Sequence, residues 1–392
     1  MTHNVEMCKC FSSLERIGTG SSSDVYSAIF TPLGTPVALK VFYKDEKYNK
    51  ELYLKEIEIL KCVNHPFIAQ YYSCYETPHM SSIIMELGEN GTLLNYMNKM
   101  KRITIIEIKK FFSQIASAIR YLHINKKIIH RDIKLENFIL DKNMSIRLLD
   151  FGFSTRMAEK LDQSGTNCGS IDYSAPELFI SPNLSYSSDI WSLGVTFYAL
   201  AAGKMPFFAE NSEKVVNEII NNEPIFPKFI PPDLIDLLLR MMDKDPATRI
   251  TITDVCEHPF FKGSPLQYYI SDSFRYEERT ETVPKKEELF QMATDLGIVV
   301  KPMKCDIDMM RAAHNIMIKM KNMIKILKNE ECLCNNEICI LPKIKRRPVE
   351  KHLSSLSIVA HGLTATSPPF KKLPYSLLVK PMSTSRKKNM EV

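Results

Sequence analysis

The stretch His130-Arg131-Asp132-Ile133-Lys134-Leu135-Glu136-Asn137 decides the fold, because it gathers six kinds of polar side chain within eight residues. It follows an apolar helical pattern over 107–123 and precedes the apolar pair Phe138-Ile139. Alone, it would be typical of a solvated charged loop. Asp150-Phe151-Gly152, however, follows 13 residues after Asn137, and Ala175-Pro176-Glu177 starts 25 residues after Asp150. An ordered set this specific is very unlikely to arise by chance.

Two further features precede this stretch. Gly18-Thr19-Gly20-Ser21-Ser22-Ser23-Asp24-Val25 lies between two strand-like runs, and its glycines allow the backbone to approach an anion, although a plain β-turn would also explain it. Lys40 ends the apolar run Val37-Ala38-Leu39-Lys40. A lysine is rarely buried unpaired, so Lys40 is either solvated at a strand end or paired with an acidic residue. The following helical pattern offers Glu51, Glu56 and Glu58.

The spacing of apolar residues divides the chain into two lobes and a tail. β-Branched and aromatic runs predict strands up to residue 87, whereas helical spacing prevails from residue 93 onward. We expect strands over 25–30, 36–43 and 81–87, and helices over 47–63, 107–123, 187–202, 212–221 and 232–243. The pattern predicts the α+β class, with a small β-rich lobe, a larger helical lobe and a mostly irregular C-terminal tail.

In order and context these motifs resemble the signature set of eukaryotic protein kinases. The resemblance covers 11–261, about two thirds of the chain, and includes Asp189-Ile190-Trp191-Ser192-Leu193-Gly194 and Arg249. It implies a two-lobed protein kinase domain that transfers the γ-phosphoryl group of ATP, with Mg²⁺, to Ser or Thr hydroxyls of protein substrates. Lys134 and Thr166-Asn167-Cys168-Gly169-Ser170 resemble the serine/threonine branch, within the calcium/calmodulin-dependent kinase-like group of AMP-activated and microtubule-affinity-regulating kinases.

The resemblance also assigns roles to individual residues. Asp132 would accept the proton of the substrate hydroxyl, and Lys134 would steady the transferring phosphoryl group. Lys40 would hold the α and β phosphates while paired with Glu56. Asn137 and Asp150 would supply the oxygen ligands of Mg²⁺.

A second group would surround the nucleotide. The loop from Gly18 would cover the phosphates, the side chain of Met85 would be the gatekeeper, and the backbones of Glu86 and Gly88 would bond the purine edge. Plain core packing is the alternative for the apolar members. The complete expected ATP-binding set is Ile17, Gly18, Gly20, Val25, Ala38, Lys40, Met85, Glu86, Gly88 and Ile139.

Regulatory and structural roles follow from the same resemblance. Thr166 is the expected activating phosphosite, because its phosphate would pair with Arg131 and order the segment, whereas an ordinary loop hydroxyl is the alternative. Glu177 and Arg249 would form a buried ion pair, and Asp189 would brace the catalytic loop. An upstream activating kinase is therefore an expected partner.

The C-terminal third carries the net charge. Of the total of +6, residues 331–392 hold 11 Lys+Arg against 4 Asp+Glu, which leaves 1–330 near neutral. We expect a linker over 262–307, a basic amphipathic helix over 308–328 with a regulatory role, and a basic, disordered tail over 329–392. Three alternatives fit the Met-rich stripe of the helix. It could dock on the kinase, with or without autoinhibition, it could bind calmodulin or a similar partner, or it could contact a surface or membrane.

Composition excludes several classes of protein. The apolar fraction of 45% and the charged fraction of 24% are those of a globular chain, and ten Cys are too few for a disulfide scaffold. The longest uncharged apolar run, 190–203, is too short to span a membrane, and a nucleic-acid partner is not expected. The expected location is the cytoplasm, and the nucleus is a second possibility because the basic clusters at 343–347 and 386–388 could be nuclear-import signals. The alternative functions are a catalytically silent pseudokinase scaffold and a calcium/calmodulin-gated kinase controlled through 308–328.

Overall fold

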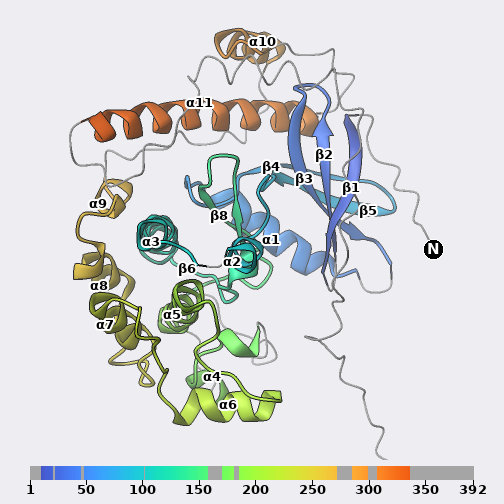
Figure 1. The fold of residues 1–392 in the computed structure, drawn as a ribbon. Coiled ribbons are helices and arrows are strands. Elements are labelled where there is room, and N and C mark those ends of the chain that lie inside the picture. The colour runs from blue at the N-terminus through green and yellow to red at the C-terminus, as the bar shows by residue number, and fades with distance from the viewer. Residues whose placement is uncertain are drawn as a thin grey trace, which may run out of the picture.

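The computed structural model describes residues 10–20, 23–45, 48–100, 102–157, 170–180, 185–271, 285–298 and 307–335. They form a small β-rich lobe, a larger helical lobe, and two C-terminal helices beside the small lobe (Figure 1). The α+β, two-lobed fold expected from the sequence is thereby confirmed.

The small lobe is built on one antiparallel sheet with strand order β1-β2-β3-β5-β4. Both faces of its central strand β3 carry buried apolar residues, since the fully buried Val37, Leu39 and Val41 lie on one face and the buried Ala38 and Phe42 lie on the other, on either side of Lys40. Both faces of the sheet therefore need a cover. The five strands are β1 (Phe11–Thr19), β2 (Asp24–Phe30), β3 (Thr35–Tyr43), β4 (Tyr71–Glu76) and β5 (Met80–Glu86).

Helix α1 (Lys50–Cys62) crosses from the sheet toward the large lobe. Asn49 begins it by accepting hydrogen bonds from the backbone N–H groups of Glu51 and Leu52, as an N-cap residue does. The helix buries Glu56 on its inner side while Glu51 and Glu58 lie exposed, which agrees with the choice of Glu56 that the kinase resemblance implied.

The large lobe packs around α3 (Ile105–Arg120) and α5 (Tyr186–Ala202). Thr104 and Glu107 form a capping box at the start of α3. Gly194 lets α5 approach its neighbour closely, because an added Cβ would lie 2.9 Å from Cβ of Met241. The other helices of this lobe are α2 (Leu93–Lys99), α4 (Glu177–Ile180), α6 (Ser212–Asn221), α7 (Pro232–Met241), α8 (Ile252–Glu257) and α9 (Leu266–Tyr269).

Four short strands frame the catalytic loop between the lobes. β6 (Ile128–Ile129) pairs with β9 (Thr155–Arg156), and β7 (Phe138–Leu140) pairs with β8 (Ile146–Leu148). The segment 130–137 is therefore held at both ends by sheet hydrogen bonds.

The C-terminal region is more helical than the sequence predicted. The expected linker over 262–307 contains α9 and α10 (Lys286–Asp295), and the helix expected over 308–328 runs as α11 (Ile307–Asn335). No Gly or Pro interrupts 307–335, which explains the longer helix. Leu289, Ala293 and Leu296 are buried from α10, at spacings of four and three residues. Within the described residues, no helix is long and apolar enough to cross a bilayer.

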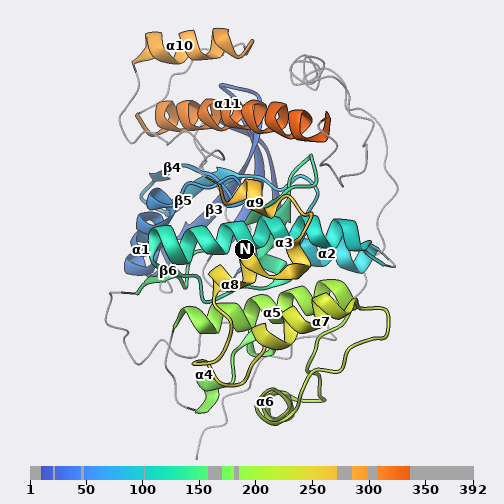
Figure 2. The same ribbon diagram turned by 90° about the vertical axis from the view of Figure 1, so that its left-hand side faces the viewer.

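Helices α10 and α11 cover the outer face of the small-lobe sheet. Both views place α11 directly on the sheet and α10 beyond it, on the side away from α5 (Figures 1 and 2). One apolar cluster joins Val37, Leu39 and Val41 of β3 to buried residues of α10 and α11. The second, larger cluster joins α1 and the inner side of the small lobe to the helices of the large lobe.

Candidate active site

The segment 130–137 is bent around the carboxylate of Asp189, which α5 presents. Its Oδ2 accepts hydrogen bonds from the backbone N of His130 at 2.7 Å and from Nε2 of His123 at 2.9 Å, while Oδ1 accepts from the backbone N of Arg131 at 2.9 Å. Arg131 has a φ of +71°, so the turn is strained and needs these bonds. Burial alone would raise the pKa of Asp189, but the hydrogen bonds hold it below its ordinary value.

Asp132 lies within this loop and is held by two neighbours. Nζ of Lys134 lies 2.9 Å from its Oδ1 and 2.8 Å from its Oδ2. Nδ2 of Asn137 donates to Oδ2 at 2.8 Å and to the backbone carbonyl of Asp132 at 2.7 Å. Because Asp132 takes the amide nitrogen of Asn137, the amide oxygen is left for another partner. A hard cation prefers an oxygen of this kind.

Lys40 joins two carboxylates from distant parts of the chain. Its Nζ lies 2.6 Å from Oε1 of Glu56 on α1 and 3.0 Å from Oδ1 of Asp150. Burial alone would lower the pKa of Lys40, but the two negative charges raise it well above its ordinary value. For Glu56 burial outweighs the attraction of Lys40, and its pKa is raised. The sequence left Lys40 either solvated or paired, and the structure pairs it with Glu56.

Asp150 follows β8 and faces Lys40 from below. Burial alone would raise its pKa, but Lys40 and the backbone N–H of Gly152 lower it. Its φ is +60°, and the following Phe151 is buried with its ring edge toward His130, at 5.0 Å between centroids. The contacts with Lys40 and Gly152 favour the ionised form of Asp150 and hold its carboxylate beside Lys40.

The strand registers bring the expected adenine-contacting residues together. Val25 lies opposite Lys40 on β3, and Ala38 lies opposite Met85 on β5. Gly88 comes shortly after β5 and packs closely against Ile139, since an added Cβ would lie 2.5 Å from Cβ of Ile139. The segment 86–91, called the hinge below, therefore rests on Ile139.

The glycine loop is partly outside the described residues, since 21–22 are not described. Beside these two residues, the backbone N of Gly20 donates to the carbonyl of Ser23 at 2.7 Å. Gly18 pairs with Val25, and Ile17 is 52% exposed at the edge of the lobe. Thr166 also lies outside the described residues, so the structure does not place it relative to Arg131.

A second ion pair supports the large lobe. Oε1 and Oε2 of Glu177 accept from Nη1 and Nη2 of Arg249 at 2.7 and 2.9 Å, and both side chains are buried. This is the bidentate, planar geometry that arginine and carboxylate favour. The predicted pair Glu177 and Arg249 is thus brought together.

Sequence reasoning missed a third charged group, behind the hinge. The side chain of Glu86 points away from the space that the hinge faces and bonds Nε of Arg147 at 2.9 Å and Nζ of Lys319 at 2.7 Å. The run Ile146-Arg147-Leu148 carried a signal, because an arginine within an apolar strand needs an acidic partner, as Lys40 did.

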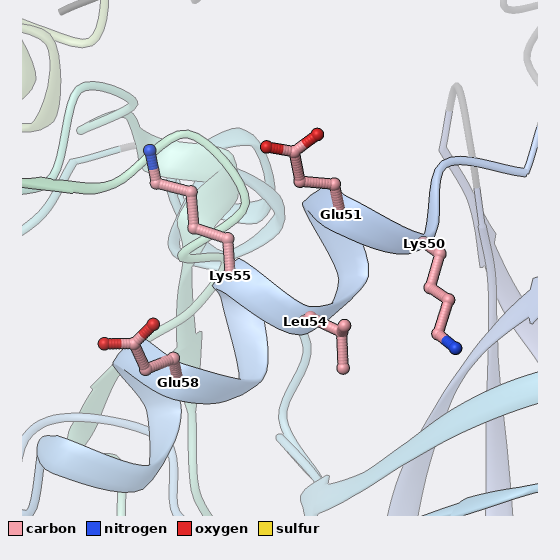
Figure 3. A pocket seen from close by; sticks show the side chains of 5 residues that line it. All are labelled: Lys50, Glu51, Leu54, Lys55 and Glu58. Carbon is pink, nitrogen blue, oxygen red and sulfur yellow. The ribbon is translucent and has the colours of Figure 1, made fainter.

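A shallow hollow on the outer side of α1 is separate from this site. It is lined by Lys50, Glu51, Leu54, Lys55 and Glu58, all of them exposed (Figure 3). Glu56 is buried on the same helix. The residues of the hollow therefore do not belong to the group around Lys40 and Asp150.

Known proteins share the whole region that holds this site. Residues 11–261 match the family described as protein kinase domain. The serine/threonine-protein kinase SIK1 of Rattus norvegicus is 36% identical over 261 residues, 65% of this chain and 33% of SIK1. The SNF1-related protein kinase catalytic subunit alpha KIN12 of Arabidopsis thaliana is 34% identical over 288 residues, 72% of this chain and 57% of KIN12.

The cell cycle serine/threonine-protein kinase CDC5/MSD2 of Saccharomyces cerevisiae is 32% identical over 273 residues, 68% of this chain and 38% of that protein. The chain thus spans between a third and somewhat more than half of the length of these relatives.

Proposed function

The chain belongs to the protein kinase domain family, and on that premise we propose that it is an ATP-dependent serine/threonine protein kinase. The observation that carries the proposal is the convergence of two groups: Lys40 with Glu56 and Asp150, and Asp132 with Lys134 and Asn137. Phosphoryl transfer requires positioning and charge neutralisation more than covalent help, and these groups supply both.

The residues present fit a nucleotide and a divalent cation. Asp150 offers an ionised carboxylate and Asn137 its amide oxygen, which are the hard oxygen ligands that Mg²⁺ accepts alongside phosphate oxygens. When bound, Mg²⁺ would neutralise charge on the transferring phosphates. Lys40 is ionised and faces the same space, where it would bind the α and β phosphates.

Asp132 would act on the protein substrate. Its carboxylate would accept the hydrogen of the incoming Ser or Thr hydroxyl and orient the oxygen in line with the γ-phosphoryl group. Lys134, which already contacts both oxygens of Asp132, would stabilise the equatorial oxygens of that group. Because Asp189 holds the loop backbone, Asp132 would be positioned before either substrate binds.

The pseudokinase alternative is not favoured, because Lys40, Asp132, Asn137 and Asp150 are all present and form two contacting pairs, Lys40 with Asp150 and Asp132 with Asn137. Regulation belongs to the same proposal. Phosphorylation of Thr166 by an upstream kinase would pair the phosphate with Arg131 and order the segment before Ser170.

The function is tested with full-length protein, MgATP and an array of Ser, Thr and Tyr peptides. We expect transfer to Ser and Thr peptides, no transfer to Tyr peptides, and loss of transfer in the Asp132→Asn variant. Binding of nucleotide without transfer to any peptide or to the chain itself would favour the scaffold instead. Dependence of transfer on calcium and calmodulin would identify the gated alternative.

A further inference from the structure

Helix α11 lies outside the kinase match, which ends at residue 261, yet it belongs to the core of the small lobe. Met309, Ile316 and Met317 are fully buried against the face of the sheet that carries Val37, Leu39 and Val41. This is the face away from Lys40, so α11 lies on the opposite side of the sheet from the nucleotide phosphates (Figures 1 and 2).

The first polar contact of α11 is with an irregular point of β4. In the pairing of β4 with β5, Tyr71 lies opposite Met85 and Ser73 opposite Ile84, so Tyr72 is an extra residue. A bulged residue leaves a backbone group without its ladder partner. Nδ2 of Asn315 donates to the carbonyl of Tyr72 at 2.8 Å, which satisfies that group beside the gatekeeper position.

The second polar contact completes a buried charged cluster behind the hinge. Glu86 is 1% exposed and shares Arg147 with Asp141, through Nε at 2.9 Å and Nη2 at 2.8 Å. The kinase domain thus supplies two carboxylates and one cation, a balance of −1. Lys319 of α11, 2.7 Å from Oε1 of Glu86, supplies the missing positive charge.

Glu86 is also tied to the adjoining backbone. Its own N donates to the carbonyl of Gln70 at 2.8 Å, and its Oε2 accepts from the N of Gln70 at 3.2 Å. Burial alone would raise the pKa of Glu86, but Arg147 and Lys319 hold it below its ordinary value. The carboxylate therefore stays charged, and its position follows the cations that hold it.

We propose that α11 is a positioning element of the nucleotide site, in which Lys319 acts through Glu86 on the hinge and Asn315 acts through the bulge at Tyr72 on the gatekeeper strand. The inference rests on the proposed function only in that the hinge backbone binds the adenine of ATP. It makes α11 a cis-acting activator. An autoinhibitory helix would have the opposite effect on activity.

The test uses full-length point variants and two readouts, calorimetric binding of MgADP and steady-state transfer from ATP. Lys319→Met is expected to raise the Kd for MgADP and the KM for ATP about fivefold, with kcat changed less than about twofold, a size typical of site-to-site coupling. Lys319→Arg keeps the charge and should restore affinity. Lys262→Met, at an exposed position of the large lobe, is the control and should match the wild type.

A double-mutant cycle separates positioning from simple stabilisation. If Lys319 acts through Glu86, its effect on the Kd for MgADP should largely disappear in a Glu86→Gln background. Asn315→Ala gives a second route should Lys319→Met fold poorly, and it too should raise the Kd for MgADP. A lower melting temperature with an unchanged Kd and KM would overturn the inference.

The two proposals fail in distinguishable ways. Increased kcat or tighter nucleotide binding in Lys319→Met would show that α11 restrains the kinase and would overturn the inference alone. Wild-type protein that binds MgADP but transfers no phosphate would overturn the proposed function, while the loss of MgADP affinity in Lys319→Met would still support positioning.

Discussion

Replacing Lys40 by Met should make the stability of the protein depend steeply on pH. Among the described residues Lys40 is the cation that contacts Glu56, whose side chain is 4% exposed and lies near Asp150. Burial already raises the pKa of Glu56, and Lys40 counteracts this rise, so its removal should raise the pKa further. An acid whose folded pKa exceeds its unfolded value binds more protons when folded, so the free energy of unfolding falls as pH rises between the two values.

The structure sets a ceiling for this loss. The ordinary pKa of Glu56 is 4.5, and a folded state that keeps this residue protonated loses about 1.4 kcal/mol for each pH unit above that value. The ceiling is therefore about 0.7 kcal/mol at pH 5 and about 3.4 kcal/mol at pH 7. The gap between wild type and Lys40→Met should widen by up to about 2.7 kcal/mol over this range.

Urea unfolding at pH 5 and pH 7 measures the gap. Adding Glu56→Gln to Lys40→Met removes the more deeply buried of the two carboxylates that lose Lys40 and should remove most of the widening of the gap between the two pH values. Adding Glu58→Gln instead should leave the pH dependence intact, because Glu58 is exposed on the same helix and lies 3.4 Å from Arg156. A gap that is the same at both pH values, or equal rescue by the two glutamine variants, would refute the reasoning.

Three further predictions concern the active site and its support. Asp132→Asn should lower kcat about 10²–10⁴-fold in a peptide phosphorylation assay, because it removes a general base, and should leave the Kd for MgADP unchanged. Transfer at the wild-type rate would refute the role of Asp132 as the general base. Glu177→Gln should lower the free energy of unfolding by about 3 kcal/mol, because the buried Arg249 loses its charged partner. The control Glu210→Gln breaks an exposed pair with Lys214 and should lower it by at most about 0.5 kcal/mol, so equal losses in urea unfolding would contradict the prediction. Gly88→Ala should raise the Kd for MgADP about fivefold, because the new methyl group overlaps Ile139, and adding Ile139→Ala should remove the overlap. An unchanged Kd of Gly88→Ala in calorimetry would count against the hinge geometry.

The part of the site that could be predicted from sequence is the part whose polar residues had no local explanation. Lys40 lies in an apolar strand, and Asp132 belongs to the eight-residue segment 130–137, which is dense in charged side chains. Both features demand partners, and the resemblance to protein kinases names them. The two-lobed fold followed because strands prevail before residues 88–91 and helices prevail after them.

The pairing of Lys319 with Glu86 could not be predicted in the same way. The two residues are far apart in the chain, and their contact depends on how α11 docks on the sheet. Local spacing reports which face of a helix is apolar but not what that face contacts. Arg147 did carry a signal, within an apolar strand, but a charge in a strand does not identify its partner.

The Met-rich stripe of α11 shows how its partner could have been inferred. A basic amphipathic helix fits a foreign protein as well as its own domain. The sequence of β3 bears on this choice, because Val37, Leu39 and Val41 alternate with residues that include Ala38 and Phe42, and a strand with apolar residues on both faces requires two covers. The nucleotide and the large lobe cover only the face of the sheet that carries Lys40. The face that carries Val37, Leu39 and Val41 therefore needs a second apolar element to cover it. Any partner that takes the stripe of α11 must therefore expose Val37, Leu39 and Val41, and would also withdraw Lys319 from Glu86.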